Sequence, residues 1–464
     1  MNLQSLNAFL SPEKSFLIAG VLVGLCMFLV NPPFMAPDEH DHFDRAYQLT
    51  LLQVLPKSTD RLIIDGLDQA GAILPLSLAD IVYRTGISNI WFNFEHKLSV
   101  KQILNIFQIP LKPEKTEFIP FDANGYPPGS YLFASAGILI GRLLSLPPLA
   151  LFYIGRLCNL TAWLGFMYLA VRLTPLGKWT FVLLALMPTS VFVAASISAD
   201  AMTNAFSFLL TALFLHTAFS SEKNITLWKF LAIVTTGIGL SYCKIGYVFL
   251  ILLAILIPKD KHIAGLDNRV LFIGLFLICL SLTVLWVYQA RSAVSTYWAE
   301  IARQHMALWK QNPLLMLQAI NTTIWVRGGL FARTVIGVLG WLDAPIPIWT
   351  IIVYWGVLIF ATVNEPAKDI VLLWHHKTML AIPVILSFLL LAVLMFFKHY
   401  DPSSGVIEGL QGRYLIPLLP SLLLMFPRRM IMKNLNYQPL PFLAWIFATH
   451  IVTLVVLVNR YFLY

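Results

Sequence analysis

The chain has 464 residues, of which 58% are apolar and only 12% are charged, and its mean hydropathy is +0.75. Soluble domains carry about 25% charged residues, so this composition excludes a chain whose main solvent is water and indicates a polytopic membrane protein. The formal charge of +9 is then first a signal of membrane topology. Because no run combines basic and aromatic residues, no nucleic-acid partner is indicated.

The first apolar run follows Lys14 and extends from Ser15 to Val30. No small-residue cleavage site follows it, so residues 1–32 are expected to form a retained signal anchor. A span requires about 20 apolar residues, and on this rule the chain offers about 11 spans. The expected fold is an all-α polytopic membrane protein. Its spans are expected at residues 15–32, 148–171, 179–198, 201–220, 227–242, 245–258, 270–290, 348–364, 378–397, 413–427 and 440–459.

Two apolar stretches are too long for one span each. Trp179 to Phe219 comprises 41 largely apolar residues, and a turn near Ser198-Ala-Asp200 would divide them. Leu227 to Pro258 is interrupted by Lys244, and as one helix it would be about 48 Å long. Two short spans instead place the basic residues before and after this stretch on one side of the membrane, so we expect two.

The basic residues predict the orientation. With the N-terminus in the cytoplasm, the short inner connections carry 13 basic residues and the short outer segments carry four, which agrees with the positive-inside rule. The inner residues are Lys14, Arg172, Lys178, Lys223, Lys229, Lys259, Lys261, Arg269, Lys368, Lys377, Arg428, Arg429 and Lys433; the outer ones are Lys244, Lys398, Arg413 and Arg460.

Two long segments are expected outside, residues 33–147 and 291–347, separated by the spans within 148–290 and followed by those within 348–464. The first outer segment holds 12 of the 23 acidic residues and is expected to fold as a small domain. Its last part, Ser130 to Leu146, is apolar but short and contains Arg142. We expect it to be an interfacial helix, because another crossing would invert every later loop.

The densest polar cluster directly follows the first span, from Asp38 to Arg45. Asp38 can cap a helix, in which Asp38, His42 and Arg45 share one face and Asp41 pairs with Arg45. One interpretation is a solvated, capped surface helix. The other is a general base, because closely spaced acids beside apolar material raise one another's pKa. Asp and His would suit a divalent metal, but no ligand spacing is diagnostic, so no metal ligand is assigned.

Several polar residues lie at or below the outer membrane boundary. The span after Lys244 covers only about 21 Å, which recesses Lys244 and favours a phosphate ligand over a lysine satisfied by carbonyl groups. Arg156 lies about 12 Å inside its span, with Asn159 one turn further along the same face. Asp200 is expected either to pair with one of these cations or to cap the following helix.

Two further segments, Leu339-Gly-Trp-Leu-Asp343 and Gln411-Gly-Arg413-Tyr414, lie at outer helix ends. Acids, cations and long loops thus gather on the outer side, whereas no glycine-rich phosphate loop marks a cytoplasmic nucleotide site. This asymmetry favours a lipid-linked phosphate substrate, with cations binding its phosphate and a carboxylate accepting a proton from a hydroxyl.

These segments resemble a known bacterial membrane family, domain of unknown function 2142. The run Met35-Ala-Pro-Asp-Glu-His-Asp-His-Phe-Asp-Arg-Ala-Tyr is similar to its Pro-Asp-Glu…His-Phe-x-Arg-Ala signature. Five further segments agree in the same order, and the resemblance extends from about residue 30 to 420. They are Tyr126-Pro-Pro-Gly-Ser-Tyr, Gly155-Arg-Leu-Cys-Asn, Ser196-Ile-Ser-Ala-Asp, Leu339-Gly-Trp-Leu-Asp and Gln411-Gly-Arg-Tyr-Leu-Ile-Pro.

The resemblance implies a grouping with the GT-C glycosyltransferases, which use polyprenyl-phosphate-linked sugars on the outer side of the membrane. It implies Asp38 as catalytic base, with Glu39 as the alternative, and Lys244, with Gly246 two residues later, as a donor-phosphate element. We further expect His42, Arg45, Arg156, Asn159, Asp200, Lys244, Asp343, Gln411, Arg413 and Tyr414 to bind substrate.

The expected function is transfer of a sugar from a polyprenyl-phosphate carrier to an envelope glycan or lipid, at the outer face of the bacterial inner membrane. No cofactor is required by the sequence, and a divalent metal is compatible with it. The first alternative is a polymerase or ligase of lipid-linked oligosaccharides. The second is a transporter or flippase, which would show two related halves, and no such internal similarity is visible.

Overall fold

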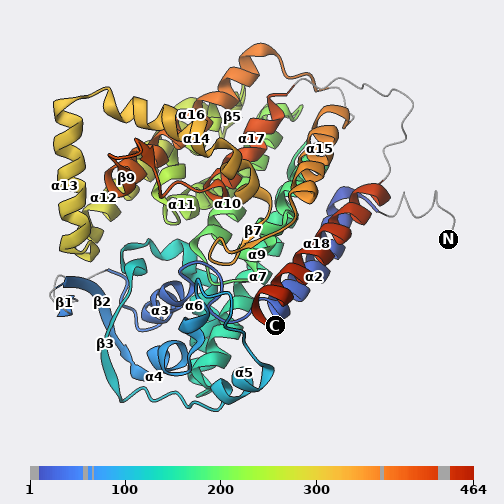
Figure 1. Ribbon diagram of the computed structural model, residues 1–464. Coiled ribbons are helices and arrows are strands. Elements are labelled where there is room, and N and C mark those ends of the chain that lie inside the picture. Colours follow the sequence, from blue (N-terminus) through green and yellow to red (C-terminus); the bar gives the residue numbers. More distant parts are fainter. Residues whose placement is uncertain (1–9, 56–60, 65–66, 366–369, 427–438, 464) are drawn as a thin grey trace.

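The computed structural model describes residues 10–55, 61–64, 67–365, 370–426 and 439–463. Within these ranges, six helices are long and apolar enough to cross a membrane. They are α2 (Pro12–Val30), α7 (Pro148–Leu173), α10 (Ala199–Phe219), α12 (Asn268–Ala290), α16 (Trp374–His399) and α18 (Pro439–Tyr461). Figure 1 shows α2 and α18 running side by side, which brings the first and last spans together.

The remaining five expected spans fall on shorter or broken helices. They are α8 (Lys178–Ala185) with α9 (Pro188–Ala194), α11 (Leu227–Ser241), the 3-10 helix η5 (Ile245–Leu256), α15 (Ile348–Asn364), and η7 (Gly412–Leu418) with α17 (Leu419–Leu424). The chain is therefore a largely helical, polytopic membrane protein.

Burial separates a central helix from helices with apolar outer faces. In α10, 89% of the apolar stretch is buried inside the protein, whereas in α12 only 28% is buried. Outward-facing residues such as Ile273, Leu277 and Val284 are more than half exposed. An apolar surface of this extent is unstable in water and is satisfied by lipid.

Both long apolar stretches are interrupted where a turn was expected, and the first is interrupted once more, within residues 179–198. The first stretch breaks before Pro188, which cannot continue the ladder of α8, and turns again before α10, where the Ser198 hydroxyl accepts the amide of Asp200 at 3.2 Å. The second breaks around Lys244. Because η5 is a 3-10 helix, its twelve residues extend about 24 Å rather than the shorter length of an α-helix.

Residues 33–147 and 291–347, which keep the names first and second outer segment after the side expected for them, were both expected outside the spans. The first outer segment contains a small antiparallel sheet, which the sequence pattern did not indicate. It is built in the order β1 (Arg61–Ile64), β2 (Leu67–Pro75) and β3 (Thr116–Pro120), with Gly71 opposite Pro120. Short helices surround it: α3 (Glu39–Leu49), α4 (Leu76–Ala79), η1 (Asp80–Arg84), η2 (Ile87–Ile90), α5 (Val100–Phe107), η3 (Asp122–Gly125) and η4 (Pro128–Tyr131).

The segment expected to form an interfacial helix contains the helix α6 (Leu132–Leu143), which packs along α7 and against α3. Its Arg142 donates to the carbonyl of Thr50 at 3.0 Å. The second outer segment is mostly helical, and contains η6 (Arg291–Ala293), α13 (Thr296–Gln311), α14 (Leu315–Ile336) and the paired strands β7 (Val338–Leu339) and β8 (Ala344–Pro345).

The helix ends that carry the basic residues expected on the cytoplasmic side lie near one another. At this end, Lys178 pairs with Glu13 at 3.7 Å, and the Glu365 carboxylate accepts the amide of Trp179. Lys261 donates to the carbonyls of Thr217 and Ser220 beside the strands β4 (Asn224–Ile225), β5 (His262–Ile263) and β6 (Leu266–Asp267). Four of the basic residues assigned to this side, Lys368, Arg428, Arg429 and Lys433, lie outside the described residues.

At the opposite end, a buried ion pair attaches α18 to the second outer segment. Arg460 donates to Asp343 at 2.8 and 2.6 Å, and the hydroxyl of Tyr461 donates to the same carboxylate at 3.2 Å. Arg460 also donates to the carbonyl of Ile90, so the pair links three segments of the chain. Asp343 was expected to bind substrate, but here it is engaged in holding the last helix.

Replacing Asp343 with Ala leaves the buried charge of Arg460 unpaired, and we expect it to lower the free energy of unfolding by about 3–5 kcal/mol. The matched control is Glu408→Ala, which breaks the partly exposed pair with Arg327 and should cost less than about 1 kcal/mol. Thermal unfolding in detergent compares the two. Equal losses would contradict a structural role for the Asp343 pair.

Candidate functional site

The site begins where the chain leaves α2 and turns into α3. Asp38 occupies the position before the first turn of α3 with a φ of 57°, in the left-handed region that few residues other than glycine adopt. Its side chain is exposed and makes no capping hydrogen bond, contrary to the expected cap. Residues in such sparsely populated backbone conformations cluster at functional sites, and the exposed carboxylate of Asp38 can be reached by a substrate hydroxyl.

The next residue, Glu39, is fully buried and forms an ion pair with Arg156 of α7. The guanidinium donates to the two carboxylate oxygens at 2.8 and 2.5 Å, and the amide of Ile197 donates to the same carboxylate at 2.9 Å. Arg156 also donates to the carbonyls of Asn31 and Pro32. Both side chains are 0% exposed, so in this arrangement they position Asp38 and are not open to a ligand.

Asn159 supports the same junction from one turn further along α7. Its amide donates to the carbonyls of Ala194 and Ser196 at 3.2 and 2.8 Å. The hydroxyl of Ser196 in turn accepts the side-chain amide of Asn31 at 3.1 Å. These bonds attach the turn between α9 and α10 to the end of α2, which places Asp200 near Asp38.

Asp200, at the start of α10, lies between two cations. It forms an ion pair with Lys244, and its Oδ2 lies 3.5 Å from Nε of Arg413. The Lys244 ammonium sits 4.5 Å from the ring centroid of Tyr414, and the Arg413 guanidinium 5.4 Å from it. Of the two expected roles for Asp200, pairing is therefore observed, and the helix is capped by Ser198 instead. We call Lys244, Asp200 and Arg413 the charge triad.

The triad carries one net positive charge when all three groups are ionised. Its three side chains are between 6% and 14% exposed, so the charge is poorly screened by water. The Nε of Arg413 has no hydrogen-bond partner among the described residues, nor does the side-chain oxygen of Gln411 two residues earlier. The Nε–H group of Arg413 can donate to an anionic ligand, and the Gln411 oxygen can accept from a ligand hydroxyl, without breaking an existing hydrogen bond.

His42 and two tyrosines connect Asp38 with the triad. The charges of Asp38, Asp200, Lys244 and Arg413 all act on His42, which places these groups around one centre. Burial lowers the pKa of His42 to about 4, so the ring is neutral near pH 7, and its Nδ1 lies 2.7 Å from the hydroxyl of Tyr131.

Tyr126 and Tyr131 were not among the expected site residues. Burial raises the pKa of Tyr126 to about 12, and that of Tyr131 also rises. The charges of Lys244, Asp200 and Asp38 act on Tyr126. The signal that could have found them is the Tyr126-Pro-Pro-Gly-Ser-Tyr segment, which was noted only for its resemblance.

Arg45 does not pair with Asp41 as expected but hydrogen-bonds to the backbone of neighbouring segments. Its guanidinium donates to the carbonyl of Tyr126 at 3.1 and 3.2 Å and to the side chain of Gln48 at 2.5 Å. It also donates to the carbonyl of Val54 at 2.8 Å. Arg45 therefore fixes the backbone of the tyrosine segment beside the triad.

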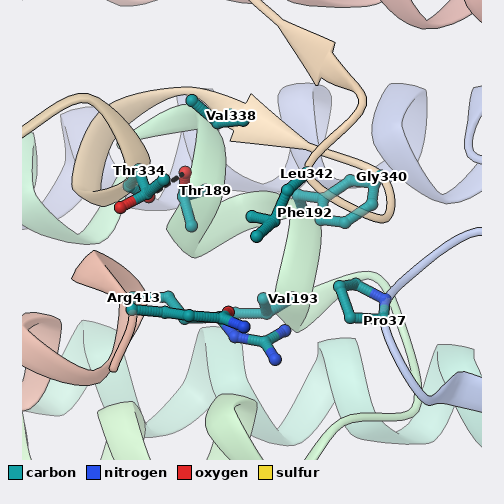
Figure 2. A pocket seen from close by; sticks show the side chains of 10 residues that line it. Pro37, Thr189, Phe192, Val193, Thr334, Val338, Gly340, Leu342 and Arg413 are labelled. Carbon is teal, nitrogen blue, oxygen red and sulfur yellow. Dashed lines mark hydrogen bonds between the residues drawn. The ribbon is translucent and has the colours of Figure 1, made fainter. Parts of the chain in front are cut away.

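Each of two cavities is lined by one cation of the triad, the smaller by Arg413 and the larger by Lys244. The smaller is lined by Pro37, Gln411 and Arg413 and by residues of α9 and the 338–342 turn. Figure 2 shows the Arg413 side chain extending from η7 past Val193 toward Pro37, the residue before Asp38. Arg413 therefore points from the triad toward the candidate base.

The larger cavity is a cleft of about 480 Å³ on the other side of Lys244. Its walls are mostly apolar and come from α12, α13 and α16, and Val287 and Val294 on its lining are 45% and 44% exposed. The cleft is thus open at the protein surface beside the end of α12. Its charged lining residues are Asp122, Lys244, Arg291 and Lys398.

A set of acids flanks the site along α3. The Asp41 carboxylate accepts the amide of Asp122 at 3.2 Å, and burial together with the charges of Asp38 and Asp44 raises the pKa of Asp41. Burial alone raises the pKa of Asp44 to about 8. In the described part of the chain, no three acidic, histidine or cysteine side chains group as ligands for a metal ion.

Substitution of the adjacent acids Asp38 and Glu39 is expected to change the stability of the protein by very different amounts. Glu39→Ala strands the buried Arg156 and should lower the free energy of unfolding by about 3–5 kcal/mol. Asp38→Asn, at an exposed position, should change it by no more than about 0.5 kcal/mol. Thermal unfolding in detergent measures both. A Glu39→Ala variant as stable as the wild type would contradict a structural role for the Glu39–Arg156 ion pair.

Asp44→Asn tests the buried acid through pH. The folded protein keeps Asp44 protonated up to about pH 8, whereas in the unfolded chain it ionises near its ordinary pKa of 3.8. Its contribution to stability is therefore fully present at low pH and is lost as the pH rises between these values. The variant cannot ionise, so its unfolding temperature relative to the wild type should rise from pH 5 to pH 8. A pH-independent difference would contradict this.

Comparison with known proteins matches residues 21–422 to a family described as predicted membrane protein (DUF2142). No curated protein and no solved structure matches the chain. The family match covers most of the chain, including Asp38 and all three residues of the charge triad. The chain therefore belongs to the family of predicted membrane proteins with domain of unknown function 2142.

Proposed function

We propose that this protein is a membrane glycosyltransferase, which moves a sugar from a polyprenyl-phosphate carrier to an envelope glycan or lipid. The observation that carries the proposal is the cleft of about 480 Å³, whose apolar walls between α12, α13 and α16 end at the ammonium of Lys244. A long isoprenoid needs an apolar passage open toward the bilayer, and its phosphate needs a cation at the end of that passage. The cleft and the charge triad offer both.

The net charge of the triad is complementary to that of a phosphodiester. A polyprenyl-phosphate sugar carries one negative charge, and Lys244 and Arg413 exceed Asp200 by one positive charge. As the bond between the anomeric carbon and the phosphate oxygen breaks, negative charge grows on the departing phosphate. Buried cations stabilise this charge strongly, because little water screens them.

Asp38 would act as the general base. The acceptor hydroxyl gives its proton to the Asp38 carboxylate, and its oxygen forms the new glycosidic bond to the anomeric carbon. The carbon–oxygen bond to phosphate breaks, and polyprenyl phosphate leaves with the bonding electrons. Glu39 and Arg156 hold the turn that presents Asp38, while neutral His42 and Tyr131 orient the reacting groups as hydrogen-bonding partners.

The proposed function requires a particular arrangement of the chain in the membrane. All 11 expected spans would cross the bilayer in a GT-C-like arrangement, with the short helices enclosed by longer neighbours and the N-terminus in the cytoplasm. The end rich in Lys and Arg faces the cytoplasm of a bacterial inner membrane, and the Asp38 site faces outward. The short helix η5 then recesses Lys244 below the membrane surface.

The experiment uses the full chain in lipid nanodiscs with polyprenyl-phosphate mannose, glucose or galactose and envelope membranes as acceptor. Release of polyprenyl phosphate is followed by mass spectrometry. Asp38→Asn should lower transfer by about 10²–10⁴-fold while donor binding persists. Lys244→Met should weaken donor binding by about tenfold or more, the cost of one lost charge-assisted contact.

Two results would contradict sugar transfer at this site, and a control variant shows that the assay is specific. Arg327→Gln, which alters a partly exposed ion pair elsewhere, serves as the control and should behave as the wild type. Near-normal transfer by Asp38→Asn would refute the assigned base. Movement of the intact donor across the bilayer without release of polyprenyl phosphate would refute the transferase itself.

A further inference from the structure

A second feature beside Asp38 is a group of aromatic rings from three segments of the chain. It consists of His40, Tyr83, Trp91, Phe92 and Trp341, which we call the aromatic platform. The ring centroids of His40 and Trp91 are 4.5 Å apart, those of Trp91 and Trp341 are 5.2 Å apart, and those of Phe92 and Trp341 are 5.3 Å apart. Phe92 is 65% exposed and Tyr83 51%, so the group has an open side.

The two tryptophans are fixed by one carbonyl group. The indole N–H groups of Trp91 and Trp341 both donate to the carbonyl oxygen of Phe34, at 3.0 and 3.4 Å. Because these donors are used inside the protein, the rings can offer a ligand only their faces. Phe34 itself has a φ of 65° in the turn that leads to Asp38, so the platform and the candidate base are built on the same strained turn.

The platform adjoins Asp38 but is separate from the cleft. His40 lies two residues after Asp38, whose charge acts on it, and Leu342, next to Trp341, lines the small cavity together with Pro37. None of the five platform residues lines the 480 Å³ cleft. Asp38 therefore has a charged, lipid-accessible site on one side and a neutral aromatic surface nearby.

The chemistry of this surface fits a sugar ring. A pyranose presents C–H groups on its faces, which pack on the electron-rich faces of aromatic rings, and hydroxyl groups at its edge. Hydrogen-bonding groups lie close to the platform. The carboxylate of Asp38 is exposed, whereas that of Asp41 is mostly buried and lies 3.2 Å from Nε2 of His40, and the buried Nδ1 of His40 has no partner among the described residues. Tyr83, Trp91 and Phe92 belong to the outer segment, whereas aromatic residues of a membrane belt lie at the ends of spans.

We infer that the aromatic platform is the acceptor subsite and that the acceptor is a glycan. A pyranose ring of this glycan stacks on Trp341 and Phe92, which directs one hydroxyl toward Asp38. This inference rests on the proposed transferase function, because it assigns the second substrate of the same reaction. It favours a carbohydrate acceptor over a lipid whose acceptor hydroxyl carries no adjoining sugar.

The test measures glycan binding without turnover. Oligosaccharides released from envelope glycans by mild acid are added to the full chain in nanodiscs, and saturation-transfer NMR records the pyranose C–H signals. The wild type should show transfer to these protons. Phe92→Ala and Trp341→Ala should weaken the apparent affinity about tenfold, as expected for the loss of an aromatic stacking partner, and Trp341→Phe should restore most of it.

Trp325→Ala is the matched control, because Trp325 is 81% exposed on α14 and lies outside the platform. Absence of pyranose signals with the wild type, or signals of equal strength in Phe92→Ala, Trp341→Ala and Trp325→Ala, would overturn the inference. Lys244→Met should keep the glycan signals while it binds the donor about tenfold more weakly. Failed glycan binding with intact donor transfer therefore rejects the platform alone, whereas failed transfer with intact glycan binding rejects the transferase.

Discussion

The buried ion pair between Glu39 and Arg156 is the interaction on which the rest of the site depends. It joins the turn after α2, the middle of α7 and the amide of Ile197 before α10 through one fully enclosed contact. A buried ion pair adds little net stability compared with apolar side chains, but breaking it is costly. Its consequence is geometric: it holds Asp38 in a left-handed conformation beside the segment that carries Asp200.

Around this pair, the chain places three kinds of surface next to one exposed carboxylate. The charge triad offers a net positive charge with little water around it, the cleft offers an apolar passage between membrane helices, and the aromatic platform offers ring faces with fixed orientation. The three come from segments far apart in the chain. Their arrangement around Asp38 and Lys244 supports the proposed reaction more directly than any one of them.

The helices that frame the site also show how a polar centre is kept inside a lipid-facing protein. α10 is almost wholly buried and carries Asp200 at its first turn, whereas α12 turns most of its apolar surface outward. Asp38 and the three residues of the charge triad lie at helix ends, where the chain can leave the regular ladder. η5 and the break before α9 provide this irregular backbone, and neighbouring helices protect it from lipid.

The sequence by itself determined the membrane class, the approximate positions of the long apolar helices and the helix ends at which the polar residues gather, because these follow from local hydrophobicity and charge. It indicated Asp38, Arg156, Lys244 and Arg413 as one group, with Asp200 as a partner of the cations. The structure brings Asp38, Asp200, Lys244 and Arg413 together, whereas Arg156 is enclosed with Glu39 and is not open to a ligand. Only the tertiary structure decided the partners: Glu39 with Arg156, Asp343 with Arg460, and Trp91 with Trp341. These pairs lie more than a hundred residues apart, and many other acids, bases and rings in the chain have the same local pattern. Which of them meet depends on how the helices pack, a choice that no short stretch of sequence contains.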